Sequence, residues 1–393
     1  MAPAPHPRMT EYLRRVATGP RGSRPLARAE ARDAMELILA GAVDPVEAGV
    51  FLVALRLKYE TDDENLGVLD ALRGATAAAA AGVDDLCDVA DPYDGFVRHA
   101  PASPFLPAVL AACGLPAVSH GARGLPPKRG VSHADVLAAA GAATDLSPDE
   151  AARRIAATDA GWAYVDQRRA CPALHALAGL RALIVKRPCL ATLEKLCGPV
   201  RGRRSHLVVG WVHKGYDRLL CTLARAQGYA SALAIRGVEG GVMPSLRAPR
   251  PALGYRRGEA QDTAVAIDPD APDAAVPRTR AGPGDGGAAG AGGDVNGDGD
   301  EGEGAPAGSA AAARPAEGAA ATADGAAATA EGAAAAGLAA LAGAPGPARD
   351  GLILLAGAIL AQAGRFPDAR SAARAARTAI EDGRAAAHFA AGR

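Results

Sequence analysis

Residues 119–130, SHGARGLPPKRG, place one histidine, three cationic side chains and three glycines within twelve positions. Glycine lets a backbone approach a ligand closely, and arginine and lysine are suitable donors to a phosphate. The same composition is also typical of a polar surface loop, so two interpretations stand at this point. The residues that could contact a ligand are His120, Gly121, Arg123, Lys128 and Gly130.

Three further segments carry side chains able to bind or react. They are DPYDGFVR (91–98), with Asp91, Asp94, Gly95 and Arg98; LRALIVKRP (180–188), with Arg181 and Arg187; and RGVEGG (236–241), with Arg236 and Glu239. Each also has a purely structural interpretation: a turn at 94–95, solvated helix positions, and a turn capped by Glu239. If the loops converge, they form a cationic pocket beside a few carboxylates, which suits a phosphate, a pyrophosphate or a nucleic-acid backbone.

Alternating strands and helices are predicted to position these loops. Strands are expected within 85–101, 115–121, 205–213 and 230–241, and helices at 103–114, 132–141 and 216–228. This alternation predicts an α/β domain with a mainly parallel central sheet flanked by helices. Ligands bind at the carboxyl ends of such strands, where three of the four segments would meet.

A small all-helical N-terminal domain precedes the α/β domain. Helices are predicted at 27–43, 44–60 and 61–76; Asp44 and Thr61 are good caps, and Glu64 completes a capping box with Thr61. Ser147 is expected to start another helix within 147–166, and one or two more should follow in 171–199.

The expected domain organisation is a basic N-terminal arm at 1–25 and a helical domain at 26–78, with helices from about 147–199 packing on it. The α/β domain comprises 79–269 and 349–389. Residues 270–348 are mostly Ala, Gly, Pro, Asp and Glu, which predicts a disordered insertion. Helices at 351–364 and 366–389 should close the chain, the first buried against the sheet.

Composition excludes several classes of protein. The 43 basic and 43 acidic residues balance, so net charge indicates no polyanionic partner. No signal-peptide core is recognisable, and the longest apolar run, 351–360, is too short to cross a bilayer. The six cysteines form no C-x-x-C pair. We therefore expect a soluble, cytoplasmic protein without a membrane partner. DVNGDGDEGEG (294–304) lacks the glutamate that ends a calcium loop, since position twelve is Ala305.

Taken together, the segments resemble the anthranilate phosphoribosyltransferase superfamily, glycosyltransferase family 3. HGARGLPPKRG is similar to the family's His-Gly-Asn-Arg-x-x-Ser-x-Lys-x-Gly loop, and Arg181 and Arg187 keep the spacing of its Arg-x-x-Leu-Gly-x-Arg segment. AGVFLVALRLKYETDDENLG (48–67) is similar to its helical domain. The resemblance covers about 10–260 and 349–385, and its motifs occur in the family's order.

The resemblance implies a homodimer formed through the helical domain and transfer of ribose 5-phosphate from phosphoribosyl pyrophosphate to an amine, with Mg²⁺ on the pyrophosphate. It also implies that Arg181 contacts an aromatic acid. The departures argue against ordinary anthranilate transfer: DPYDGFVR replaces a Gly-Thr-Gly-Gly-Asp loop, and Ala122 replaces an asparagine. The family's magnesium-binding Asp-Glu pair is missing after RGVEGG, leaving Asp91, Asp94 and Glu239 as a possible substitute site.

This pattern is closest to a diverged, glycosyltransferase-like or YbiB-like branch, and it leaves three functions open. The first is a glycosyltransferase that binds a phosphorylated sugar and acts on an unknown acceptor. The second is a non-catalytic nucleic-acid-binding protein on the same scaffold, using Arg201, Arg203 and Arg204 of RGRRSH (201–206) and the Arg-rich start. The third is a structural homologue with neither activity.

Overall fold

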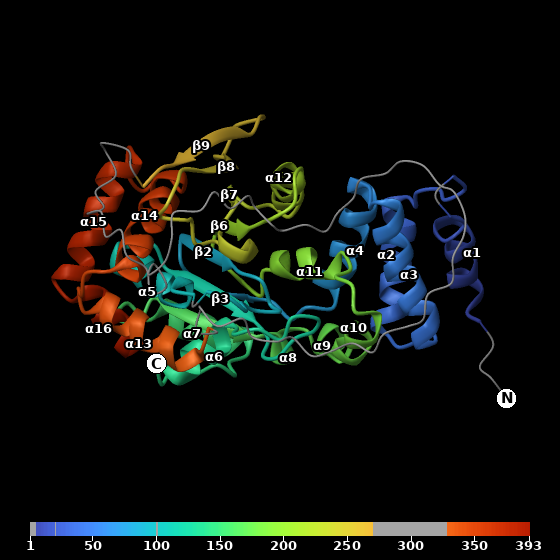
Figure 1. The fold of residues 1–393 in the computed structure, drawn as a ribbon, viewed down its shortest axis with the longest axis horizontal. Coiled ribbons are helices and arrows are strands. Elements are labelled where there is room, and N and C mark those ends of the chain that lie inside the picture. Colours follow the sequence, from blue (N-terminus) through green and yellow to red (C-terminus); the bar gives the residue numbers. More distant parts are fainter. Residues whose placement is uncertain (1–4, 20, 100, 270–327) are drawn as a thin grey trace, which may run out of the picture.

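The computed structural model describes residues 5–19, 21–99, 101–269 and 328–393. A helical bundle lies at one end of an elongated molecule, and a sheet covered by helices forms the rest (Figure 1). The bundle consists of α1 (Pro7–Val16), α2 (Arg28–Leu39), α3 (Pro45–Lys58) and α4 (Asp62–Gly74). The predicted caps are present: Asp44 accepts a hydrogen bond from Val46 N, and Thr61 accepts one from Glu64 N.

Helix α1 lies where the sequence predicted a basic, solvated arm. Met9, Tyr12 and Val16 recur at helical spacing and are buried against the bundle. Two arginines of this helix are held by acids of α2, since Arg8 pairs with Asp33 and Arg15 with Glu30. The arm prediction is therefore wrong for these residues, because the apolar stripe outweighs the charge run.

The α/β domain is built on a seven-stranded sheet in the order β4-β3-β2-β6-β7-β8-β9. The strands are β2 (Asp85–Ala90), β3 (Ala117–Gly121), β4 (Trp162–Asp166), β6 (Arg204–Gly210), β7 (Ser231–Ile235), β8 (Arg250–Tyr255) and β9 (Thr263–Ile267). Pairing from β4 to β7 is parallel, while β8 and β9 are antiparallel. The mainly parallel α/β fold is thus confirmed. A separate parallel pair joins β1 (Ala79–Ala80) to β5 (Val200–Arg201).

Three strands of the seven-stranded sheet were not predicted. Strand β4 follows helix α7 (Pro148–Ala156) inside the segment expected to begin a helix, and β8 and β9 have no counterpart in the predicted elements. Helix α7 packs on the sheet side, where Ala151 and Ile155 share a core with Val165 of β4. We had expected the helices from about 147 onward to pack on the bundle, but α7 does not.

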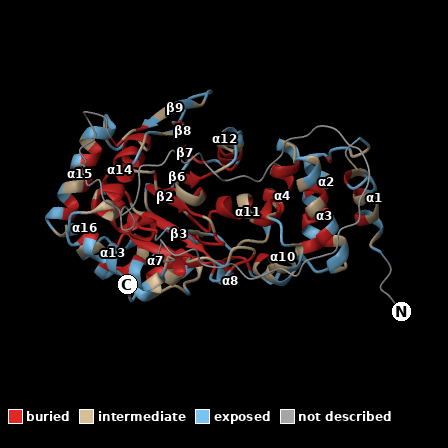
Figure 2. Ribbon diagram, in the orientation of Figure 1, coloured by how far each residue is buried: buried red, intermediate tan, exposed pale blue. Residues whose placement is uncertain are grey.

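Helices from both halves of the chain cover the sheet at the end opposite the bundle (Figure 1). They are α5 (Leu106–Ala112), preceded by the short helix η1 (Ser103–Phe105), α6 (His133–Ala139), α13 (Ala330–Leu341), α14 (Pro347–Gln362), α15 (Ala369–Glu381) and α16 (Arg384–Ala391). Helix α14 is buried over most of its length, as predicted (Figure 2). Phe389 of α16 stacks on Trp162 of β4, with ring centroids 5.2 Å apart.

Helix α13 corrects one boundary of the predicted insertion. Residues 270–327 lie outside the described residues, but 328–348 contain this helix and the start of α14. Ala333 and Ala334 are buried, and a Cβ at Gly337 would overlap the ring of Phe105. Small side chains let this helix pack closely, which a composition argument cannot detect.

Short helices connect the bundle to the sheet. They are α8 (Gln167–Ala170), α9 (Pro172–Ala176), α10 (Ala178–Ile184), α11 (Leu190–Leu193) and η2 (Glu194–Leu196). Leu174, Leu190 and Leu193 share a core with Phe51 and Leu55 of α3, so this part of 147–199 does pack on the bundle. Helix α12 (Tyr216–Ala226) adds to the same core. In the part of the chain that the structure describes, no helix is long and apolar enough to span a membrane.

Candidate functional site

The loops that follow β2 and β3 are joined to each other at the carboxyl edge of the sheet. Phe96 N donates to Val131 O at 2.9 Å, and Val131 N donates to Phe96 O at 2.8 Å. Gly95 has a φ of +78°, and a Cβ there would overlap Gly130 O; a Cβ at Gly130 would lie 2.6 Å from Phe96 O. These two glycines therefore let one loop approach the other closely. From the sequence, we had expected them to let the backbone approach a ligand.

A group of charged side chains, here called the cation cluster, surrounds this junction; it comprises Arg98, Lys128 and Arg187 with Asp94 and Glu239. Arg187 Nε donates to Asp94 Oδ2 at 2.8 Å. Lys128 Nζ donates to Gly95 O at 3.2 Å and lies 3.9 Å from Glu239 Oε2. Arg98 is exposed, and its side chain forms no ion pair with the residues that the structure describes.

The cluster has the electrostatics of an anion site. Burial lowers the pKa of Lys128, and the charge of Arg187 lowers it further, while Asp94 opposes the shift. Three cations face two carboxylates, so one positive charge is left uncompensated. Lys128 donates one hydrogen bond to Gly95 O, and its other two N–H groups have no acceptor among the residues that the structure describes. The arrangement can bind an anion such as a phosphate without first breaking an internal ion pair.

Glu239 anchors the β2 loop. It lies in the short helix η3 (Val238–Gly240) with a φ of +50°, and its carboxylate accepts hydrogen bonds from the backbone N–H groups of Val97, Arg98 and His99 at 2.8–3.0 Å. Burial would raise the pKa of Glu239, but these backbone donors hold it below its ordinary value. Its capping role matches the structural interpretation of this residue.

Asp91 is also committed to the protein. Its Oδ1 accepts from Val242 N at 2.6 Å, and its Oδ2 accepts from Ser103 Oγ and lies 2.6 Å from His133 Nε2. Burial would raise the pKa of Asp91, but His133 and these hydrogen bonds lower it. The carboxylate is thus ionised and fully bonded.

These environments do not fit the substitute magnesium site. The oxygens of Asp91 and Glu239 are used by protein donors, and Asp94 is paired with Arg187. Among residues 5–269 and 328–393, apart from the undescribed positions 20 and 100, no three metal-ligating side chains gather into a candidate site. We derive no step that passes through a metal.

Three predicted loop residues do not join the cation cluster. His120 is buried; its Nε2 lies 2.8 Å from Asp88 Oδ1, and its Nδ1 bonds the hydroxyl of Tyr93. Arg123 turns back onto the protein and donates to Thr144 Oγ1 at 2.8 Å. Gly121 ends β3, where a Cβ would lie 3.1 Å from the hydroxyl of Tyr164.

Arg181 is engaged inside the protein. Its side chain is 0% exposed, and its Nη1 and Nη2 donate to the two carboxylate oxygens of Glu194 at 2.6 and 3.0 Å. Both groups lie where α10 and η2 meet. Arg181, which the resemblance assigns to an aromatic acid, thus has a carboxylate of the protein as its partner here, while its buried Nε has no hydrogen-bond partner among the described residues.

Sequence reasoning missed Glu194 and Lys195. Both are buried, and Lys195 Nζ donates to Gly210 O at 2.6 Å, at the carboxyl end of β6. Burial lowers the pKa of Lys195 to about 8, while the nearby charges of Asp91 and Glu194 oppose that shift. The detectable signal was a charged pair inside the otherwise apolar stretch LATLEKL (190–196).

The three arginines of the nucleic-acid hypothesis have protein partners. Arg203 pairs with Asp84 at 2.8 Å, and Arg204 forms two hydrogen bonds with Asp85 at 2.6 and 2.7 Å. The guanidinium of Arg201 lies over the ring of Tyr229, 3.9 Å from its centroid. These residues therefore do not form an open stripe of uncompensated charge.

Comparison with known proteins gives consistent results. Residues 10–76 match a model of the glycosyl transferase family, helical bundle domain. The chain is 32% identical over 234 residues to an anthranilate phosphoribosyltransferase of Rubrobacter xylanophilus, covering 59% of this chain and 65% of that protein. It is 28% identical to that of a Rhodopseudomonas palustris strain, covering 68% and 75%. The chain spans 65% of the Rubrobacter protein and 61% of a relative from Methylobacterium, which is less than two thirds of each.

Solved structures share the fold. Anthranilate phosphoribosyltransferase from Thermus thermophilus superposes with a TM-score of 0.69 at 22% identity, covering 94% of this chain and 95% of that one. The Saccharomyces cerevisiae enzyme in complex with PRPP and Mg gives a TM-score of 0.69 at 12% identity, with 98% and 96% covered. At these identities, the likeness concerns the fold alone.

Proposed function

The chain belongs to the anthranilate phosphoribosyltransferase family, glycosyltransferase family 3, and on that premise we propose that its cation cluster binds a phosphorylated sugar or a pyrophosphate group. Any reaction would be transfer of the sugar to an acceptor other than anthranilate. The observation that carries the proposal is the position of Lys128, Arg187 and Arg98 around one loop junction at the carboxyl edge of a parallel sheet.

Each part of the cluster has a distinct function in this proposal. Lys128 supplies N–H donors, and Arg98 supplies an exposed guanidinium that forms no ion pair with the described residues. Arg187 can share its charge between Asp94 and the ligand because its side chain is 37% exposed. Glu239 and the Phe96–Val131 pairing hold the two loops in place before a ligand arrives.

Anthranilate is disfavoured as the acceptor. Arg181 is the residue that the family resemblance assigns to the aromatic acid, and its two Nη groups are already bonded to Glu194. A carboxylate ligand would have to displace a buried, bidentate partner. We therefore expect the acceptor to bind without contacting Arg181.

Calorimetric titration of the wild-type protein with phosphoribosyl pyrophosphate tests the proposal. We expect binding that weakens as salt rises, and binding that persists without Mg²⁺ because no three metal-ligating side chains gather among the described residues. Absence of heat with and without Mg²⁺ would refute the proposal. A strict requirement for Mg²⁺ would show that the ion enters with the ligand.

We also propose that the protein forms a homodimer through its helical domain. Val46, Val50 and Leu57 project from one side of α3 and are 70, 43 and 75% exposed, and Leu183 of the neighbouring α10 is 81% exposed. Such an apolar face is typical of an interface. Sedimentation of wild type and Leu57→Asp should show a dimer and a monomer; a wild-type monomer at all concentrations would refute this.

The nucleic-acid alternative has weaker support, because Arg203 and Arg204 are paired with Asp84 and Asp85. Its test is the affinity for single-stranded DNA at two salt concentrations. A steep salt dependence that Arg203→Ala and Arg204→Ala reduce would favour this function over the first.

A further inference from the structure

Two arginines without an acidic partner lie close together where the helical bundle meets the amino edge of the sheet. Arg73 is in the last turn of α4, and Arg201 is in β5, just before β6. Arg73 Nη1 donates to the side-chain oxygen of Gln227, which follows α12. The guanidinium of Arg201 lies over the ring of Tyr229, 3.9 Å from its centroid. We call Arg73, Arg201, Gln227 and Tyr229 the arginine joint.

The arginine joint contains hydrogen-bond donors that the protein does not use. Arg201 Nε and Nη2 and Gln227 Nε2 are buried and have no acceptor among the residues that the structure describes. A ring face attracts the charge of a guanidinium but leaves the N–H groups at its edge unbonded. A buried donor without an acceptor is costly, so three of them in one place point to a ligand that accepts hydrogen bonds.

The joint also has an excess of positive charge. Neither Arg73 nor Arg201 forms an ion pair with the described residues. The acids around them are engaged elsewhere, since Asp70 is held by an arginine of α2 and Asp88 accepts a hydrogen bond from the hydroxyl of Tyr229. Burial lowers the pKa of Arg73, and the charge of Arg201 lowers it further. An anion between the two arginines would offset their repulsion and accept from the unused donors.

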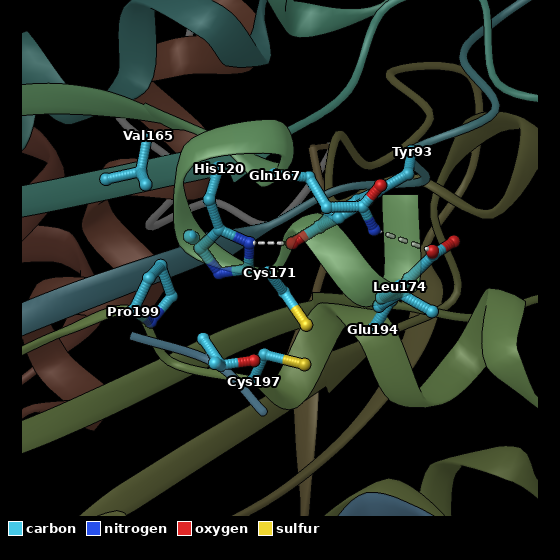
Figure 3. A pocket seen from close by; sticks show the side chains of 11 residues that line it. Tyr93, His120, Val165, Gln167, Cys171, Leu174, Glu194, Cys197 and Pro199 are labelled. Carbon is cyan, nitrogen blue, oxygen red and sulfur yellow. Dashed lines mark hydrogen bonds between the residues drawn. The ribbon is translucent and has the colours of Figure 1, made fainter. Parts of the chain in front are cut away.

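The segment that carries Arg201 holds the guanidinium in place. A Cβ at Gly198 would lie 2.5 Å from Arg201 Nη2, so the glycine makes room for the guanidinium. Cys197 and Pro199 of the same segment line a cavity of about 10 Å³ (Figure 3), which has room for one water molecule and not for a larger anion. Arg73 and Arg201 are themselves partly exposed, so a small anion can reach the joint from solvent.

We propose that the arginine joint is a binding site for a small oxyanion with two negative charges, such as inorganic phosphate. Its oxygens accept hydrogen bonds from Arg201 and from Gln227 Nε2, and its charge lies between the two guanidinium groups. Arg73 belongs to the bundle, whereas Arg201 and Gln227 precede β6 and β7, so the bound anion fixes the bundle to the sheet. The site is at the amino edge of the sheet, and the cation cluster is at the carboxyl edge.

A carboxylate placed in the joint by mutation tests the charge argument. Gln227→Glu keeps the acceptor for Arg73 and replaces the unused Nε2 donor by an anionic oxygen. We expect this full-length variant to melt at a higher temperature than wild type in chloride buffer. Gln362→Glu is the matched control, because Gln362 is 7% and Gln227 8% exposed, but Gln362 Nε2 donates to Ala232 O. The control should melt below wild type; an equal loss in Gln227→Glu would contradict the proposal.

Inorganic phosphate is the probe for the ligand. Melting of the three proteins is recorded in about 10 mM phosphate and in chloride of the same pH and ionic strength. The cation cluster is identical in all three, so phosphate bound there stabilises them equally. We expect the phosphate-induced shift to be at least about 2 °C larger in wild type and Gln362→Glu than in Gln227→Glu. Equal shifts would overturn the proposal, whatever phosphoribosyl pyrophosphate does at the cluster.

Arg73→Met gives a second test that does not introduce an acid. The substitution keeps an apolar stem and removes one cation of the pair, so the phosphate-induced shift should fall by at least about 2 °C relative to wild type. Arg28→Met is the control, since Arg28 already has Asp70 as its partner, and it should keep the wild-type shift. An undiminished shift in Arg73→Met would overturn the proposal.

Discussion

The cation cluster and the Arg181–Glu194 pair show two ways of placing arginines beside a site. In the cluster, Arg187 is partly exposed and shares one carboxylate, and Lys128 has donors to spare. In the connecting helices, Arg181 is fully buried and both of its Nη groups are bonded to one acid. Partner and solvent access therefore decide whether a cation can bind a ligand, and residue type alone does not. Four changes test this contrast, in decreasing order of effect.

The largest effect is expected from breaking the buried pair. Arg181→Ala leaves Glu194 charged and without its main partner, so the free energy of unfolding should fall by about 3–5 kcal/mol in urea titrations. Arg187→Ala should cost much less, because water can solvate Asp94 once the arginine is removed. Recovery of most of the loss in Arg181→Met/Glu194→Leu would confirm the cause; equal losses for Arg181→Ala and Arg187→Ala would remove the contrast.

Gly95→Ala should disrupt the loop junction that carries the cluster. The substitution places a Cβ against Gly130 O at a φ of +78°, and we expect a loss of about 2 kcal/mol or more, measured by denaturant unfolding. Gly124→Ala is the matched control, since Gly124 has a φ of +58° and open space around its Cβ. Equal losses for both variants would show that only the backbone conformation matters, not the contact between the loops.

Lys128→Ala tests the cluster as an anion site. Loss of one charged donor should weaken phosphoribosyl pyrophosphate binding about tenfold, or about 1.4 kcal/mol, in calorimetry. Arg203→Ala, which removes a surface ion pair elsewhere, should leave that affinity unchanged. An unchanged affinity in Lys128→Ala would place the ligand elsewhere.

Lys195 lies between the two regions, and pH provides its test. Its pKa is lowered to about 8 in the folded state, whereas an unfolded lysine titrates near 10.4. The unfolded state therefore binds more protons between these values, and wild type should gain stability relative to Lys195→Met as pH rises from 8 to 10. The expected slope is about 1 kcal/mol per pH unit, from paired urea titrations. Ionisation of the buried cysteines is common to both proteins and cancels; a flat difference would mean that Lys195 titrates normally.

The sequence predicted those parts of the fold that depend on local signals. Asp44 and Thr61 marked helix starts because a side-chain cap is a property of a few neighbouring residues. The meeting of the loops after β2 and β3 also followed, because neighbouring parallel strands end at one edge. Strand β4 was missed because 147–166 was read as one helical segment, although Asp159 and Gly161 form a turn between α7 and WAYVD. Helix α1 was missed because its arginines masked a stripe of three apolar residues.

The roles of individual site residues were less predictable. His120 has a residue type suited to a ligand, but its two nitrogens are bonded to Asp88 and Tyr93 inside the protein. Arg181 meets Glu194 thirteen positions later, a pairing that depends on how α10 and η2 pack. Partner choice of this kind is set by tertiary distance, which spacing along the chain does not reveal.

The stacking of Phe389 on Trp162 has a consequence for synthesis of the protein. Helices α1–α4 contact one another over short sequence separations and can pair early, and Leu174, Leu190 and Leu193 of the connecting helices then add to their core. The sheet differs, because β4 is covered by a helix made more than 200 residues later, and α14 and α16 complete its core. Until residues 384–391 are made, the nascent chain therefore exposes an apolar face of the sheet. A chaperone that holds the chain during this time would protect it from aggregation.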